Sequence, residues 1–173
     1  MPPPRLLLAP GASGTVERLR PMLDGLRARG ITADGVALPT GSAERALPTW
    51  RAALHAHDPA QTVIGGQSFG GRVASLLAAD GAGVRGLVLL CFPLHPPGRP
   101  ERAEERAAHL ARIACPVLLL SGESDPFARL GLLREAATRI RDAELVTYPG
   151  IGHGLHRVRD DALDRVAAFV SRV

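Results

Sequence analysis

Short apolar runs alternate along the chain with longer segments in which apolar residues recur every three or four positions. The apolar runs have the length of β-strands, and the longer segments have the period of amphipathic α-helices. The expected strands are 5–9, 31–38, 61–66, 84–92, 115–122 and 143–150. The expected helices are 15–29, 43–57, 69–79, 101–112, 128–140 and 160–171. The pattern therefore predicts six strands, each followed by a helix.

This order of elements predicts an α/β fold with a doubly wound, six-stranded parallel sheet and helices on both faces. Parallel neighbours need crossover connections, and the strands read as unbroken apolar runs, as in sheets covered on both sides. Pro21, near the middle of the first expected helix, predicts a kink or a later helix start. The sequence has no repeats or linkers long enough to separate domains, so we expect residues 1–173 to form one domain.

The composition is typical of a soluble globular protein. Apolar residues make up 46% of the chain, and no stretch approaches the roughly 20 apolar residues of a membrane span. The opening MPPPRLLLAP lacks the apolar core, about 7–15 residues long, of a secretion signal. We therefore expect a cytoplasmic protein with no membrane partner. Cys91 and Cys115 show no metal or redox spacing and are expected to be reduced thiols.

The charge pattern argues against nucleic acid as a partner, although the net charge is +4 and the pI is near 10.3. All 21 basic residues are Arg, and they are spread along the chain, often beside acids. Aromatic residues, which stack on single strands, make up only 3%. The absence of Lys excludes a Walker loop, Schiff-base chemistry and a Ser–Lys pair. His55 and His57 lie on different faces of a helix, so we expect no metal and no cofactor.

The segment VIGGQSFGGRVAS contains the pattern G-x-S-x-G at 66–70, where an expected strand meets an expected helix. A sharp turn of this kind strains the backbone at the central residue and needs tiny residues two before and two after it. Gly66 and Gly70 fill those places around Gln67 and Ser68. The turn exposes the serine hydroxyl and predicts a nucleophile. The alternative is a tight turn with a capping serine.

A serine nucleophile needs a base, and the base needs an acid that orients it. Asp125 follows the fifth expected strand in SGESDPF, and His153 follows the sixth in YPGIGHGLH. The order Ser68, Asp125, His153 is the order found in α/β hydrolases, with each residue after a different strand. The sequence therefore predicts a catalytic triad of these three residues.

Each of the two partners has an alternative. Asp125 followed by Pro126 is also a common helix start, and Glu123 is a second candidate for the acid. The rival base is His156. We favour His153 because Gly152 and Gly154 flank it, and a loop that carries an imidazole over the sheet edge is expected to need unusual backbone angles.

Two backbone N–H groups are expected to bind the oxyanion that forms during acyl transfer. One belongs to Phe69, which opens the helix after the serine. The other is expected in the loop APGASGT, where Pro10 has no N–H and Gly11 makes the turn. Ala12 is therefore the expected second donor.

The segments GGQSFGGRVAS, LCFPLHPPGRPE, PVLLLSGESDPF and YPGIGHGLH resemble, in this order and spacing, small lidless α/β hydrolases. The group is the dienelactone-hydrolase-like one that includes the testis-expressed hydrolase-like proteins and a domain of the non-specific-lethal complex. The resemblance covers nearly the whole chain. It implies a minimal α/β-hydrolase fold without a cap domain, with Ser68 as nucleophile, Asp125 as acid and His153 as base. Relatives commonly have His-Gly where this chain has Pro10-Gly11.

These observations predict a serine hydrolase of the esterase or thioesterase type, a monomer or homodimer with an open site for a small acyl substrate. His95, in the PLHPPG loop, is expected either to pack that loop or to contact substrate. A catalytically silent interaction module is the alternative, and it would not need all three triad positions filled. A nucleotide binder of flavodoxin-like topology would need a phosphate-binding loop, and this sequence has none.

Overall fold

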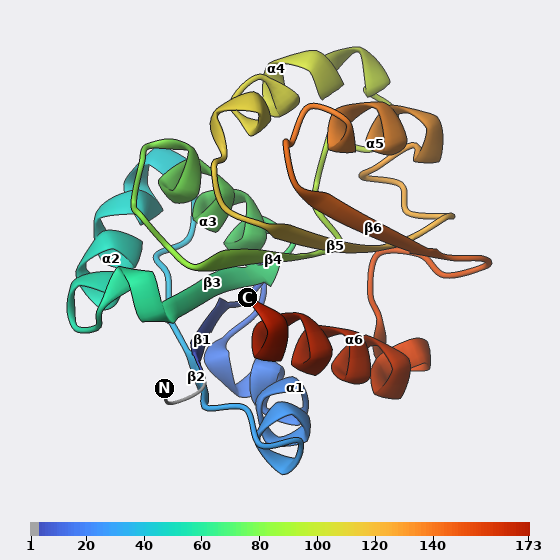
Figure 1. Cartoon of the computed structure of the whole chain (residues 1–173). Coiled ribbons are helices and arrows are strands. Elements are labelled where there is room, and N and C mark those ends of the chain that lie inside the picture. The colour runs from blue at the N-terminus through green and yellow to red at the C-terminus, as the bar shows by residue number, and fades with distance from the viewer. Residues whose placement is uncertain (1–3) are drawn as a thin grey trace.

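The computed structural model describes residues 4–173 and contains one parallel sheet of six strands (Figure 1). The strands are β1 (Arg5–Ala9), β2 (Ala33–Gly35), β3 (Thr62–Gln67), β4 (Gly86–Leu90), β5 (Val117–Gly122) and β6 (Ala143–Tyr148). Their order across the sheet is β2-β1-β3-β4-β5-β6, so the chain reverses its direction of winding after β2. The predicted doubly wound parallel sheet is confirmed.

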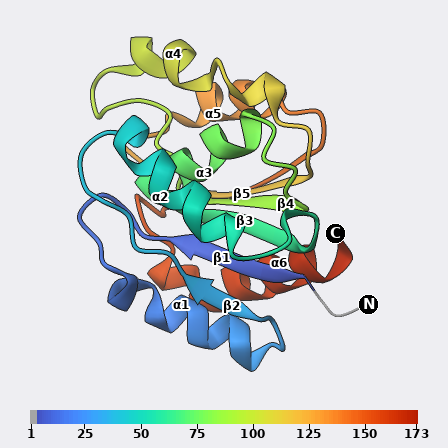
Figure 2. The ribbon, with the colours of Figure 1, turned by 90° about the vertical axis from the view of Figure 1, so that its left-hand side faces the viewer.

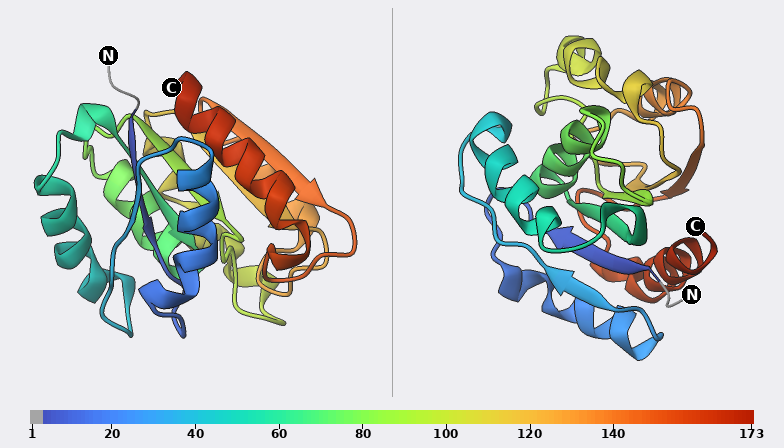
Figure 3. Two further views of the ribbon diagram at one scale, coloured as in Figure 1. Left: turned by 90° about the horizontal axis from the view of Figure 1, so that it is seen from below. Right: turned by 60° about the vertical axis from the view of Figure 1, so that its left-hand side comes forward.

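Helices cover both faces of this sheet. They are α1 (Val16–Ala28), α2 (Ala43–His55), α3 (Phe69–Ala79), α4 (Ala103–Ala107), α5 (Leu130–Ala137) and α6 (Arg159–Arg172). The helices α1 and α6 pack side by side on one face, and α2 to α5 lie over the other (Figures 1 and 2). The left-hand view of Figure 3 shows α1 and α6 from below, in front of the sheet. The arrangement is a three-layer αβα sandwich.

Two cores lie back to back because side chains alternate between the faces of each strand. Leu7, Leu89 and Leu119 are buried against α2 to α5. Val88 and Leu118, one residue away along β4 and β5, are buried against α1 and α6. Strands that bury both faces need apolar residues at every position, which explains the unbroken runs in the sequence.

Three details of the predicted elements differ in the structure. The strand expected at 31–38 is only Ala33–Gly35, at the sheet edge beside β1. Pro21 lies inside α1 at an exposed position, so it does not delay the start of that helix. The helix expected at 101–112 is a short α4 between two 3₁₀ turns, η2 (Pro100–Arg102) and η3 (Leu110–Arg112). Between α4 and η3, the buried His109 turns inward to Ser75, so a tertiary contact overrides the helical period.

The connection after β4, residues 91–102, is short and carries no inserted subdomain. Within residues 4–173 the carboxyl edge of the sheet is therefore not covered by a cap. In the same described range, no helix combines the length and the apolarity that crossing a membrane requires.

Candidate active site

Ser68 lies at the turn between β3 and α3 with φ 48° and ψ −115°. A positive φ is rare for residues other than glycine and marks a strained backbone. Two backbone contacts hold the turn: the N–H of Ser68 donates to the carbonyl of Leu90 at 2.8 Å, and the N–H of Arg72 donates to the carbonyl of Ser68 at 3.0 Å. The turn thus ties the serine to β4 on one side and to the first turn of α3 on the other.

The glycines around Ser68 have the steric reason that the sequence predicted. A Cβ atom on Gly66 would lie 2.5 Å from the carbonyl oxygen of Ala9 and 2.6 Å from the carbonyl carbon of Gly70. A Cβ atom on Gly70 would lie 2.5 Å from the carbonyl oxygens of Ala9 and Pro10. Because these neighbours are backbone atoms, they cannot move aside easily. Only glycine at both positions allows β1, β3 and α3 to approach this closely.

Ser68, His153 and Asp125 form one hydrogen-bonded chain. The distance from Ser68 Oγ to His153 Nε2 is 2.8 Å, and the distance from His153 Nδ1 to Asp125 Oδ2 is also 2.8 Å. The carboxylate accepts the Nδ1–H proton, which leaves Nε2 as the acceptor of the serine hydroxyl proton. The structure thus brings together the three residues that the sequence analysis selected from positions up to 85 residues apart.

The Asp125 side chain is fully buried, whereas 22% of the His153 side chain is exposed. A buried carboxylate needs hydrogen-bond partners. Its Oδ1 accepts the backbone N–H of Phe127 at 2.8 Å while Oδ2 faces His153. Asp125 does not start a helix, because α5 begins only at Leu130. The alternative interpretation of Asp125 as a helix cap is therefore wrong.

Neither rival residue occupies a position in the hydrogen-bonded chain. Glu123 accepts a hydrogen bond from Thr147 Oγ1 at 2.8 Å on the neighbouring strand. His156 is exposed in the 3₁₀ turn that precedes α6. The glycines beside His153 do not supply the unusual backbone angle expected of them: neither Gly152 nor Gly154 has a positive φ, and the left-handed residue of this loop is Gly150, with φ 69°.

The loop after β1 lies directly against the serine. A Cβ atom on Gly11 would stand 3.7 Å from the Cβ atom of Ser68. A turn closes this loop, since the N–H of Gly14 donates to the carbonyl of Gly11 at 3.0 Å. Ala12 is exposed within the turn. Phe69 is the first residue of α3, where no carbonyl of the same helix can accept its N–H.

Two neighbours of the triad could not be recognised from the sequence. The ring of Phe127 packs on the His153 imidazole with 4.4 Å between centroids. Cys91, at the end of β4, is fully buried and has φ 52°. Burial, together with the negative charge of Asp125, raises the pKa of the Cys91 thiol to about 12. Both residues lie in segments quoted above, but nothing in the sequence indicates that they contact His153, and only the fold brings them to it.

Cys91, Asp125 and His153 are donors of the types that bind metals, and their ligand atoms lie within 4.8 Å of one another. Two chemical features fit a metal poorly. Metals bind the thiolate, which the raised pKa of Cys91 disfavours. The imidazole and the carboxylate already bond to each other at 2.8 Å. The donor set fits the hydrogen-bonded chain better than a metal centre.

His95 packs its own loop against the segment that carries Asp125. Its Nδ1 donates to the carbonyl of Pro96 at 2.8 Å, and its Nε2 accepts the N–H of Arg129 at 2.9 Å. The backbone N–H of His95 also donates to the backbone carbonyl of Phe127 at 2.9 Å. Because both ring nitrogens are occupied by backbone groups, this histidine has the loop-packing role of the two that we considered.

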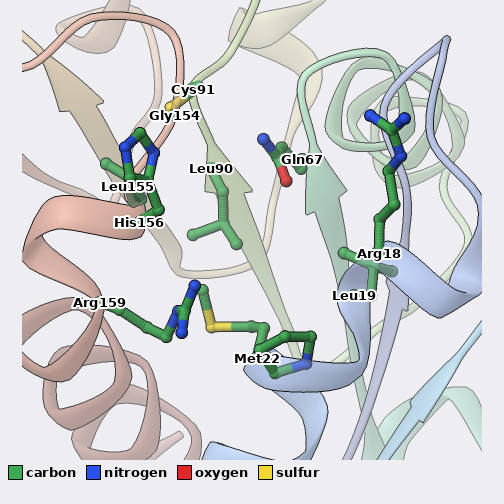
Figure 4. A pocket seen from close by; sticks show the side chains of 11 residues that line it. Arg18, Leu19, Met22, Gln67, Leu90, Cys91, Gly154, Leu155, His156 and Arg159 are labelled. Atoms are coloured by element: carbon green, nitrogen blue, oxygen red, sulfur yellow. The ribbon is translucent and has the colours of Figure 1, made fainter.

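A cleft adjoins the triad on the side of α1 and α6 (Figure 4). It spans about 600 Å³ of empty space, part of it open to solvent. Gln67 and Gly154, the neighbours of Ser68 and His153 in the sequence, lie in its wall. The remaining lining residues are Arg18, Leu19, Pro21, Met22, Leu90, Cys91, Leu155, His156 and Arg159.

Comparison with solved structures shows the same fold in several hydrolases. A monoacylglycerol lipase from Paleococcus ferrophilus superposes with a TM-score of 0.80, at 13% identity over 96% of this chain and 93% of its own. A thioesterase domain of the curacin biosynthetic pathway gives 0.74, at 16% identity over 97% and 90%. Esterase 2 of Thermogutta terrifontis, phosphonylated by sarin, gives 0.72, at 19% identity over 98% and 83%.

At such low identity these likenesses concern the fold alone. No curated protein matches the sequence. A family model described as an alpha/beta hydrolase domain matches residues 30–169, which is most of the chain and includes β3 with Ser68, the loop with Asp125 and the loop with His153. The chain therefore belongs to the alpha/beta hydrolase domain family.

Proposed function

We propose that this protein is a serine hydrolase of the carboxylesterase or thioesterase type. The observation that carries the proposal is the chain of two 2.8 Å hydrogen bonds from Ser68 through His153 to Asp125. It has the spacing and the proton arrangement that nucleophilic acyl transfer requires. The positive φ of Ser68, at the tip of a strand-to-helix turn, adds the geometry of an exposed nucleophile.

In the proposed reaction, Ser68 Oγ attacks the carbonyl carbon of the substrate while its proton passes to His153 Nε2. The electron pair of the carbonyl bond moves to the oxygen, which the N–H groups of Phe69 and Ala12 bind as an oxyanion. Collapse of this intermediate breaks the bond to the alcohol or thiol, and His153 returns the proton to the leaving group. Water then repeats the sequence on the acyl-enzyme. Asp125 holds the imidazole and stabilises its charged form.

The site and the structural neighbours support a proposal for the substrate class. The triad needs no metal or cofactor for acyl transfer, and no cap restricts access to it within residues 4–173. Structures with this fold include proteins described as a lipase, an esterase and a thioesterase. We therefore propose a small acyl ester or thioester as substrate. Membership of the dienelactone-hydrolase-like group is part of the same proposal.

Labelling with a fluorescent fluorophosphonate tests the proposal, because such reagents react with activated serines. The wild-type protein is expected to take up one label and to hydrolyse p-nitrophenyl butyrate. Ser68→Ala is expected to lose the label and to lower kcat by at least a thousandfold. The matched control is Ser171→Ala, on the exposed face of α6, which keeps both properties. Full esterase activity in a folded Ser68→Ala protein would refute the assignment. An unlabelled wild-type protein would favour the interaction module instead.

A further inference from the structure

The segment 123–129, which carries Asp125, lies between β5 and α5 and consists of turns. Its first two N–H groups donate to backbone carbonyls at the end of β6 and in the loop that follows it, at 3.0 and 2.9 Å. Within residues 4–173, the two hydrogen bonds that fasten residues 126–129 to another loop both end on His95. The position of the acid therefore depends on side-chain and loop contacts, and not on the hydrogen bonds of a helix or strand.

His95 holds the second half of this segment at two points. Its backbone N–H donates to the carbonyl of Phe127, and its ring Nε2 accepts the N–H of Arg129, both at 2.9 Å. The ring is oriented for the second bond by its Nδ1–H, which donates to the carbonyl of Pro96 at 2.8 Å. His95 is only 4% exposed, so water competes little for these bonds.

Phe127 contacts both the acid and the base of the triad. Its N–H donates to Asp125 Oδ1 at 2.8 Å. Its ring packs on the His153 imidazole, with 4.4 Å between the centroids and 36° between the planes. The backbone of this residue thus fixes the carboxylate, and its side chain restricts the tilt of the imidazole. Because His95 holds the carbonyl of the same residue, a shift of this loop would disturb Asp125 and His153 together.

We propose that His95 and Phe127 form a clamp that holds the imidazole of His153 in line between the acid and the nucleophile of the triad. Both are positioning residues, and the inference rests on the proposed function. Neither lines the cleft beside the triad, so the clamp acts on the reacting groups and not on the binding of substrate. Hydrogen bonds of 2.8 Å tolerate little displacement, and a misplacement of about 1 Å can lower the rate of an enzyme roughly a hundredfold.

Substitutions of His95 test the first half of the clamp. His95→Leu removes both ring nitrogens, so kcat for p-nitrophenyl butyrate is expected to fall roughly 10- to 100-fold while KM changes less than about twofold. His95→Gln places an amide oxygen near the position of Nε2, where it can accept the N–H of Arg129, and kcat is expected to return to within about threefold of wild type. The matched control is His109→Leu. His109 is also buried, but its ring bonds to Ser75 on α3, so this variant should lose stability and keep its kcat.

Phe127→Leu tests the second half of the clamp and leaves the backbone hydrogen bonds in place. Leucine does not cover the face of the imidazole, so kcat is expected to fall about tenfold with little change in KM. This variant also decides the matter if His95→Leu does not fold, which urea unfolding of each variant establishes. Wild-type kcat in the folded Phe127→Leu protein, or a loss of kcat in His95→Gln as large as in His95→Leu, would overturn the clamp.

The Nδ1 proton of His153 gives a readout that needs no turnover. An imidazole proton donated to a buried carboxylate resonates far downfield in the nuclear magnetic resonance spectrum and is protected from exchange with water. The wild-type protein is expected to show this resonance, and its loss in His153→Gln assigns it. Phe127→Leu and His95→Leu should broaden it or move it upfield, whereas His109→Leu should leave it unchanged. Its absence from the wild-type spectrum would count against the clamp.

The clamp and the proposed function fail in different ways. If Ser68 takes no fluorophosphonate label, the hydrolase is refuted, and a resonance of His153 that depends on Phe127 and His95 would still support the clamp. If Ser68 is labelled but kcat and the resonance are the same in wild type, His95→Leu and Phe127→Leu, the clamp is refuted and the hydrolase stands.

Discussion

Backbone strain is concentrated at the candidate active site. Among residues 4–173, Ser68 and Cys91 are the two residues other than glycine with a positive φ, at 48° and 52°. They end the neighbouring strands β3 and β4. Each is held by a 2.8 Å backbone hydrogen bond, from Ser68 to Leu90 and from Cys91 to Leu120. Strain of this kind persists only where the surrounding structure enforces it, and it is common at active sites.

The buried His109, which is not part of the candidate active site, predicts that the stability of the protein depends on pH. His109 is buried with its Nε2 2.7 Å from Ser75 Oγ, and the Ser75 hydroxyl also bonds to the carbonyl of Arg72. Burial, with the charges of Arg72 and Arg112, lowers the pKa of His109 from 6.5 to about 4. Between these values the unfolded chain binds the proton more readily than the folded protein. The free energy of unfolding is therefore expected to fall by about 1.5 kcal/mol from pH 6.5 to pH 5.

Urea titrations at several pH values measure this effect. His109→Gln should remove the decline over that interval, because an uncharged amide replaces the titrating ring. His55→Gln, at the exposed end of α2, should leave it in place. The same slope in wild type and His109→Gln would contradict the assignment. The structure lowers the pKa values of the carboxyl groups of Glu44, Glu104 and Asp161 from ordinary values of 4.5 or below, so the stability that they contribute is lost mainly below pH 4.5, outside this interval.

At the scale of elements, glycines set how closely neighbouring segments approach. Where α1 crosses α6, a Cβ atom on Gly25 would lie 2.5 Å from Leu163 Cδ1. At the junction of β3 and α3, a Cβ atom on Gly66 would meet backbone instead, at 2.5 Å from the Ala9 carbonyl oxygen. A leucine side chain can rotate away, whereas a strand in the middle of a sheet cannot. The junction that carries Ser68 is therefore the less tolerant of the two.

Gly66→Ala is expected to destabilise the protein by about 3 kcal/mol, because the backbone of β1 or α3 must shift. The matched control is Gly131→Ala in α5. No atom lies within 4 Å of the Cβ position there, so a gain of about 0.5–1 kcal/mol in helix stability is expected. Urea unfolding of both variants measures the difference. A Gly66→Ala protein as stable as wild type would show that the turn relaxes at little cost.

For the whole molecule, the two cores share one sheet. Trp50, on α2, is buried in the core beneath α2 to α5, and Cys91 is buried in the core beneath α1 and α6. Each of the four inner strands, β1, β3, β4 and β5, contributes side chains to both cores. Loss of either core would therefore expose one whole face of the sheet, which favours loss of both together.

Unfolding is therefore expected to be a single cooperative transition. In a Cys115→Ser background, Cys91 is the remaining thiol of the sequence. Trp50 fluorescence, the reactivity of the Cys91 thiol and far-ultraviolet circular dichroism should give the same urea midpoint. A midpoint for Cys91 well below that of Trp50 would show that the α1 and α6 face opens separately.

The order of the elements and the outline of the candidate site can be read from the amino-acid sequence. Unbroken apolar runs specify strands covered on both faces, and the glycines at 66 and 70 specify the sharp turn at Ser68, because these signals depend on residues that are neighbours in the chain. The order of Ser68, Asp125 and His153 was readable for the same reason, since each follows its own strand and parallel strands end at one edge. The placement of Ala12 as an oxyanion donor stays a prediction.

The surroundings of those residues depend on contacts that form only in the folded chain. The packing of Phe127 on His153, the burial of Cys91 beside Asp125 and the inward turn of His109 join segments that no local pattern relates. The cleft between α1 and the start of α6 is lined by residues of both helices, which lie more than 130 positions apart in the sequence. Such contacts depend on strand order and helix packing, which are set by the burial of the whole chain and leave no periodic trace in it.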